Sequence, residues 1–161
     1  MKIFHRLLLW ITARLPAREI RGEHGDPYLE RYYVFSLRGW NVYIHRFLAS
    51  DPDRGLHDHP WENSISLVLS GGYRELRTYS YRILRPGYLN RIRGHDFHRI
   101  LLDPGREAWT LFLHGPRTKG WGFQRNGEYT PFAEHKDDYP AARWWETAPR
   151  GRYLRQPRKA A

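Results

Sequence analysis

The first fifteen residues show the hydrophobic pattern of an amphipathic helix. Within the segment 2–15, KIFHRLLLWITARL, an apolar stripe at helical spacing is formed by Ile3, Phe4, Leu7, Leu8, Ile11 and Leu15. Lys2, Arg6 and Arg14 lie outside this stripe, and Pro16 ends it. We predict a helix over 2–15 that packs across a barrel or in a dimer interface. The alternative is a basic helix resting on a membrane surface.

After a polar turn at 22–27, the pattern changes to short apolar segments typical of strands. Eight strands are predicted, at 31–37, 41–48, 65–69, 73–79, 81–84, 88–92, 98–102 and 109–113. Turn sequences separate several of them, namely DPDRG at 51–55, GG at 71–72, PG at 86–87 and DPG at 103–105. Short strands broken by Gly, Pro and Asp indicate a β-sandwich or barrel. The tail, including 141–146, is expected to add a short helix.

The composition supports a single β-rich domain. The chain has 161 residues, the length of one ordinary domain, and it contains neither an internal repeat nor a long linker. Its 7 Trp and 11 Tyr favour half-buried pleated surfaces. We therefore predict one domain, with a barrel core over about 28–125, the helix at 2–15 and a C-terminal extension at 126–161.

The chain contains no cysteine, so it has no disulfide bond and any metal must be bound by nitrogen or oxygen atoms. This suits a reducing cytosol, and a cytoplasmic location is predicted. A basic start and a Leu-rich middle also fit a signal peptide, but Arg14 follows closely and a small-residue cleavage site is lacking. The apolar run is shorter than the ~20 residues of a transmembrane helix.

The net charge of +10, from 27 Lys and Arg against 17 Asp and Glu, favours anionic partners. The arginines are spread along the chain rather than gathered in a tail. Arg46, Arg74 and Arg117 are predicted, as a group, to hold a substrate carboxylate or phosphate. The charge is not accompanied by a helix-turn-helix or by RNP aromatics, so nucleic acid is not expected to be the primary partner.

Three histidines have the spacing of a metal site. His57 and His59 are separated by one residue, so on an extended strand both point to the same side and can reach one ion. The Gly71-Gly72 turn and a second stretch, GYLNRIRGHDFHRI, follow. In that stretch a turn glycine leads through a strand to His98, which opens the next apolar strand.

These two stretches resemble the two conserved motifs of the cupin superfamily. The first family motif contains a glycine, a His-x-His pair, a glutamate and a second glycine, and it matches at His57, His59 and Gly71. The second runs from a glycine to a histidine, with the spacing of Gly87 to His98. The resemblance covers roughly residues 40–115. It implies an all-β fold, a single double-stranded β-helix or jelly-roll barrel, with one divalent metal on His57, His59 and His98.

The sequence departs from the cupin motifs at three positions. Arg93 and His95 stand where the second motif usually has proline and glycine, and the glutamate of the first falls on Ser64. Glu62 lies two residues earlier, on the same face of a regular strand. The ligands are therefore either three histidines or a shifted His/His/Glu/His set, with His95 in reserve. The three-histidine option resembles the cysteine-dioxygenase branch, and the chain is also similar to a group of small cupins without a known activity.

The first functional hypothesis is a mononuclear non-haem iron oxygenase, of the cupin dioxygenase type. Three neutral imidazoles leave Fe(II) its full positive charge and leave positions open for substrate and O₂. This favours a small anionic substrate, which Ser64 or Tyr73 would orient. Imidazole also suits Zn, Cu and Ni, so the ligands alone do not identify the metal, and Zn, Mn or Ni are the alternatives to Fe(II).

Two other functions remain open from the sequence. In a redox-neutral isomerase, epimerase or lyase, Zn, Mn or Ni would polarise a carbonyl and Glu62 or His95 would act as the general base. In a non-catalytic module, the barrel would bind a small ligand or nucleic acid. A homodimer paired through the N-terminal segment or a sheet face is also expected.

Overall fold

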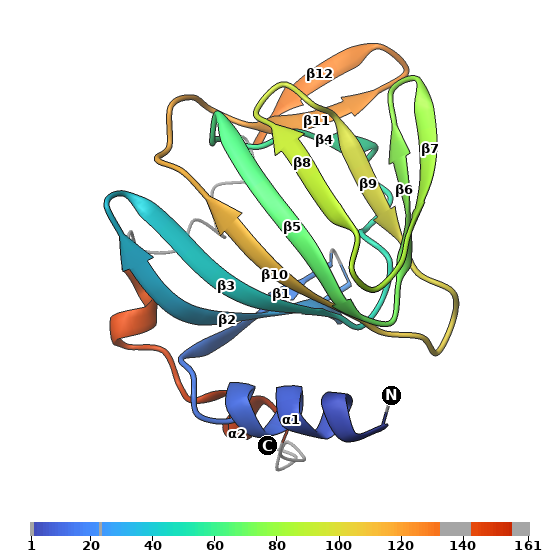
Figure 1. The fold of residues 1–161 in the computed structure, drawn as a ribbon. Coiled ribbons are helices and arrows are strands. Elements are labelled where there is room, and N and C mark those ends of the chain that lie inside the picture. Colours follow the sequence, from blue (N-terminus) through green and yellow to red (C-terminus); the bar gives the residue numbers. More distant parts are fainter. Residues whose placement is uncertain (1, 23, 133–142, 156–161) are drawn as a thin grey trace.

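The computed structural model describes residues 2–22, 24–132 and 143–155. Two six-stranded antiparallel sheets curve around a shared interior (Figure 1). The first sheet contains, in spatial order, β1 (Ala17–Arg21), β2 (Pro27–Leu37), β3 (Trp40–Phe47), β10 (Ala108–His114), β5 (Asn63–Ser70) and β8 (Leu89–Arg93). The second contains β12 (Glu128–Pro131), β11 (Gly122–Arg125), β4 (Leu56–His57), β9 (His98–Leu101), β6 (Tyr73–Arg77) and β7 (Ser80–Leu84). The predicted all-β barrel is observed.

Side-chain alternation gives the first sheet one face toward the interior and one toward the N-terminal helix. On β3, Tyr43, His45 and Phe47 line an internal cavity. Ile44, between them, belongs to the apolar cluster under the helix instead. The alternation continues across the sheet, because β10 and β3 pair in a regular antiparallel register. The interior is therefore lined by aromatic and polar side chains rather than by aliphatic ones alone.

The N-terminal helix α1 (Lys2–Thr12) packs across the outer face of the first sheet, next to the short C-terminal helix α2 (Gly151–Leu154) (Figure 1). Leu8 is buried, in one cluster with Ile44 and Trp109. The predicted packing across the barrel is thus observed, although the buried face is narrower than the predicted stripe: Ile3 is 85% exposed. In the described part of the chain, no helix is long and apolar enough to cross a bilayer.

The eight predicted strands are present, with shifted ends, but four further strands were not predicted. β1, β4, β11 and β12 are two to five residues long and carry little apolar alternation. They are held by pairing with neighbouring strands, which a local pattern does not reveal. β1 and β12 extend the sheets beyond the predicted core limits of 28 and 125. The helix expected near 141–146 lies partly outside the described residues; its described part is the 3₁₀ helix Trp144–Glu146.

The turn between β5 and β6 gives a stability prediction. Gly71 has φ +73° there, and a Cβ at this position would lie 2.1 Å from the backbone oxygen of Glu107. Gly105 has a similar φ of +70°, but nothing lies within 4 Å of its Cβ position. We expect Gly105→Ala to cost about 1 kcal/mol of unfolding free energy through backbone strain alone. Gly71→Ala should cost about 1–3 kcal/mol more, because the backbone must also move.

Urea denaturation of the two variants measures this difference directly. Equal losses of unfolding free energy in Gly71→Ala and Gly105→Ala would show that the backbone at Glu107, just before β10, moves away freely. That result would contradict the close contact described above.

Candidate metal centre

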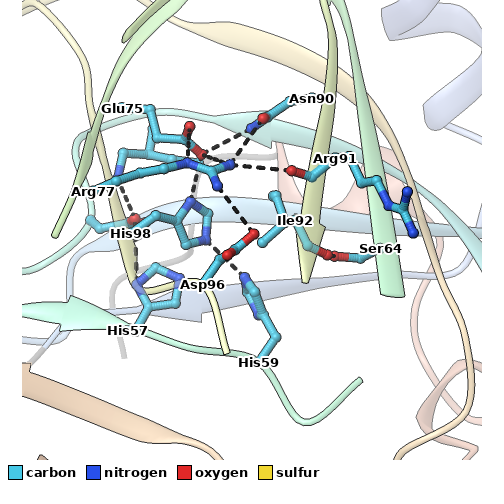
Figure 2. Close-up of polar contacts among 12 residues, drawn as sticks. His57, His59, Ser64, Glu75, Arg77, Asn90, Arg91, Ile92, Asp96 and His98 are labelled. Carbon is cyan, nitrogen blue, oxygen red and sulfur yellow. Dashed lines mark hydrogen bonds and ion pairs between the residues drawn. The ribbon is translucent and has the colours of Figure 1, made fainter. Parts of the chain in front are cut away.

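Three histidine side chains converge on one point inside the barrel (Figure 2). His57 ends β4 and pairs directly with His98, the first residue of β9. His59 follows two residues after His57. One ring nitrogen from each histidine lies within 4.8 Å of the others, and the Nε2 atoms of His59 and His98 are 2.8 Å apart. The strand pairing therefore brings together the three residues that the spacing predicted.

The residue between the two histidines anchors their segment. Asp58 is buried and points away from the cluster, toward β11. Its Oδ1 accepts a hydrogen bond of 2.7 Å from the backbone N–H of Gly122, and its Oδ2 forms an ion pair with Lys119. The period-two alternation that turns Asp58 outward holds His57 and His59 inward.

The three imidazoles fit a divalent metal ion. Two nitrogens bound at adjacent positions, each about 2.1 Å from an ion, lie about 3 Å apart, close to the His59–His98 separation. Nδ1 of His98 is 2.8 Å from Oε1 of Glu75. Since a carboxylate only accepts, Nδ1 carries the proton and Nε2 turns its lone pair toward His59. His98 is thus held in the tautomer that a metal ligand needs.

Burial keeps the other two histidines in their neutral form. Desolvation, followed by the charge of His98, lowers the pKa of both His57 and His59 well below the usual value of 6.5. Nδ1 of His57 lies 3.9 Å from the carboxylate of Asp51, which itself accepts a hydrogen bond from the N–H of Ile100. Metals bind neutral imidazole, so the lowered pKa of His57 and His59 favours the form of these two rings that binds a metal.

Glu75, which the sequence analysis did not single out, supports the cluster from behind (Figure 2). It is fully buried on β6. Its carboxylate accepts hydrogen bonds from His98, from Nδ2 of Asn90 at 2.9 Å and from Nε of Arg77 at 2.8 Å. Burial alone would raise its pKa, but the hydrogen bonds and charges of His98 and Arg77 lower the pKa to about 2. Histidine ligands commonly have such a carboxylate partner.

A cavity of about 710 Å³ opens beside the cluster. Its walls include all three histidines and several aromatic rings. Trp61 stacks on His59, with ring centroids 5.2 Å apart, and on His114 at 3.9 Å. These rings fix the orientation of His59 and make the wall largely apolar.

Of the two residues predicted to orient a substrate, only Tyr73 lines this cavity. Burial, as the largest cause, raises the pKa of Tyr73 to about 12, so its hydroxyl stays protonated. The hydroxyl of Ser64 instead donates to the backbone oxygen of Ile92 at 3.0 Å, inside the sheet. Ser66, one alternation further along β5, occupies the cavity wall.

Glu62 and His95 are not part of the cluster. Both are exposed and line a separate, shallower depression together with Lys119. The side chain of His95 is 76% accessible, and Glu62 lies just before β5, where the strand has not yet begun. The proposed shift of the ligand set to Glu62 required a regular strand through residues 62–64. Because the strand starts at Asn63, the structure favours the three-histidine set.

The three predicted anion-binding arginines do not form a group. Arg46 lies on the opposite face of β3, where Nε donates to Glu107 at 2.5 Å. Arg74 is on the surface, paired with Asp103 at 2.8 Å. Of the three predicted arginines, only Arg117 lines the cavity. The prediction for Arg46 was wrong because of strand alternation, since the even-numbered residues of β3 face the helix. Arg31, which does face the cavity, was not predicted.

No protein-family model matches the sequence, and no curated protein matches it. Solved structures do. A cupin-2 domain protein from Rhodospirillum rubrum is 13% identical, with a TM-score of 0.59 over 77% of this chain and 83% of that one. A sugar phosphate isomerase of the cupin superfamily from Silicibacter pomeroyi has a TM-score of 0.54, at 13% identity over 73% and 85%. Fe(II) HppE has a TM-score of 0.52, at 14% identity over 62% and 56%. At these identities the likeness is one of fold.

Proposed function

We propose that this chain, which has the cupin fold, is a metal-dependent enzyme, a mononuclear non-haem iron oxygenase acting on a small anionic substrate. The observation that carries the proposal is the convergence of three imidazole nitrogens, without a carboxylate among them, on the wall of an internal cavity. His57, His59 and His98 would hold the ion. Fe(II) HppE shows that the same fold accommodates this metal.

The ligand set favours an anionic substrate. Three neutral imidazoles supply no negative charge, so a bound Fe(II) would keep its full positive charge toward the cavity. Iron, when bound, would supply the redox chemistry with O₂. The protein would supply the rest: Glu75 holds the proton on Nδ1 of His98, and the rings of Trp61 and Phe112 exclude water from the reacting groups.

The proposal is tested by metal content followed by oxygen dependence. Protein purified without added metal and without chelators should contain close to one equivalent of iron per chain, or take it up from Fe(II). The loaded protein should then consume oxygen when small carboxylates are supplied, and turnover should cease in anaerobic buffer. Failure to retain any divalent metal after reconstitution would exclude the proposal and leave a non-catalytic binding barrel.

A redox-neutral isomerase or lyase is the second candidate, and one residue favours it. Glu62 and His95, predicted as its general base, lie outside the cavity. Asp51, however, is a buried carboxylate in the cavity wall, 3.9 Å from His57. From that position it would be able to exchange a proton with a substrate held at the three histidines. Zinc, manganese or nickel in the purified protein, with equal turnover in air and under argon, would support this candidate.

A further inference from the structure

A half-buried arginine reaches the cavity from the middle of β2. Arg31 lies directly opposite His45 in the β2–β3 register, and both side chains line the cavity. Nε of Arg31 donates to Nε2 of His45 at 2.9 Å. Desolvation, followed by the charge of Arg31, lowers the pKa of His45 well below 6.5, so His45 accepts this hydrogen bond as a neutral ring. One edge of the guanidinium is thereby fixed in place.

The opposite edge of the same guanidinium has no partner among the residues that the structure describes. Within the described ranges, neither terminal nitrogen of Arg31 makes a hydrogen bond, and no carboxylate pairs with it. The two acids in the cavity wall are engaged elsewhere: Glu19 pairs with Arg21, and Asp51 accepts from Ile100. A desolvated cation without a counter-ion costs several kcal/mol. Such a cost is expected where a ligand provides the missing charge.

The position of Arg31 suits a ligand that also reaches the three histidines. The ring of Phe112 lies between the two groups, with its centroid 4.8 Å from that of His45 and 6.4 Å from that of His59. All of these side chains border the same cavity of about 710 Å³. A small molecule lying along Phe112 would therefore have one end at Arg31 and the other at the histidine cluster.

We propose that Arg31 binds the carboxylate of a small carboxylic acid, whose other end lies at His57, His59 and His98. This deepens the proposed function and rests on it for the role of the histidines. The two terminal N–H groups of one arginine match the two oxygens of a carboxylate. The guanidinium of Arg31 lies over the ring of Tyr43, 5.4 Å from its centroid, and Arg18, opposite Arg31 in the β1–β2 register, borders the same cavity. The cavity wall around Arg31 is rich in aromatic rings, and desolvating a phosphate dianion there costs more than desolvating a singly charged carboxylate.

Binding of propanoate, of its neutral analogue propanamide and of inorganic phosphate tests this site. Affinity is measured by calorimetry and by the rise in melting temperature, on protein whose metal content has been determined. Propanoate should bind the wild type more tightly than either other probe. Arg31→Met should weaken propanoate binding about 10- to 100-fold, the effect of losing hydrogen bonds to a charged group, without changing the weak binding of propanamide. Arg74→Gln, which removes a surface arginine, is the matched control and should bind propanoate like the wild type.

Arg31→Lys keeps the charge but loses the two-point contact, so it should fall between the wild type and Arg31→Met. This variant guards against a folding defect in Arg31→Met. Equal propanoate affinity in all four proteins, or phosphate bound in preference to propanoate, would overturn the inference. Propanoate binding that depends on Arg31 in a protein that holds no metal would uphold the arginine site and refute the metal-dependent function. Normal metal content with no effect of Arg31→Met would refute the arginine site and leave the metal-dependent function standing.

Discussion

Replacing His98 by alanine should reduce the bound metal from close to one equivalent per chain to less than a tenth. His98 contributes one of the three converging nitrogens and is the one held by Glu75, so its loss removes both a ligand and the orientation of the cluster. Loss of an outer partner of a ligand alone costs 10- to 100-fold in affinity, and loss of the ligand should cost more. Metal per chain is measured by elemental analysis after dialysis, and affinity by competition with a chelator of known strength.

His95→Ala is the matched control for this experiment. It removes a histidine three residues away in the sequence, whose side chain is 76% exposed and borders a different depression. Its metal content should equal that of the wild type. A loss of metal in His95→Ala as large as in His98→Ala would mean that the ion binds at the surface, outside the cavity. Circular dichroism of both variants establishes that the barrel has formed.

The metal cluster could be predicted from sequence because its information is local. His57 and His59 share one strand face by the period-two rule, and His98 opens an apolar strand at the spacing of a known motif. The residues that complete the site are not local. Glu75 and Arg31 reach the interior from strands β6 and β2, which were predicted as strands but without a register toward the histidines.

A weak signal for both residues is present in the sequence. Glu75 lies two residues after the inward-facing Tyr73, and Arg31 lies two residues after the buried Leu29, so each shares a strand face with an inward-facing residue. A charged residue in phase with the apolar face of a strand indicates a buried charge, which needs a partner. Arg46 was chosen instead, although its phase on β3 places it on the helix side. Strand phase therefore indicates which arginines reach the cavity.

The strands that were not predicted lie together at one end of each sheet, β1 in the first sheet and β12, β11 and β4 in the second. β5 and β10 are central strands with clear alternation, and both were predicted within two residues. β11 and β12 form a hairpin at the edge of the second sheet, and every residue of β12 is exposed. The pairing of β11 with β12 is local, but the pairing of Phe123 with His57 depends on a chain segment about 65 residues away. Long-range pairing of this kind is invisible to a window of a few residues.

Two substitutions of Glu75 should show separately how this residue affects the stability of the barrel and the affinity for the metal. In Glu75→Leu the buried guanidinium of Arg77 and the amide of Asn90 lose the acceptor that they share. Breaking a buried ion pair from one side costs about 3–5 kcal/mol of unfolding free energy, so this variant should be strongly destabilised. Urea denaturation measures the loss.

Glu75→Gln keeps the shape and one acceptor oxygen, and it should fold while its metal affinity falls 10- to 100-fold, because His98 loses its charged partner. The matched control is Glu62→Gln, the same change at the exposed glutamate that the sequence offered as a ligand; neither its stability nor its metal affinity should change. If Glu62→Gln lost metal and Glu75→Gln did not, the ligand set would be the shifted one with a carboxylate, and Glu75 would serve only to neutralise Arg77. The pair of variants thus decides between the two ligand sets, since each removes one negative charge from only one of the candidate carboxylates.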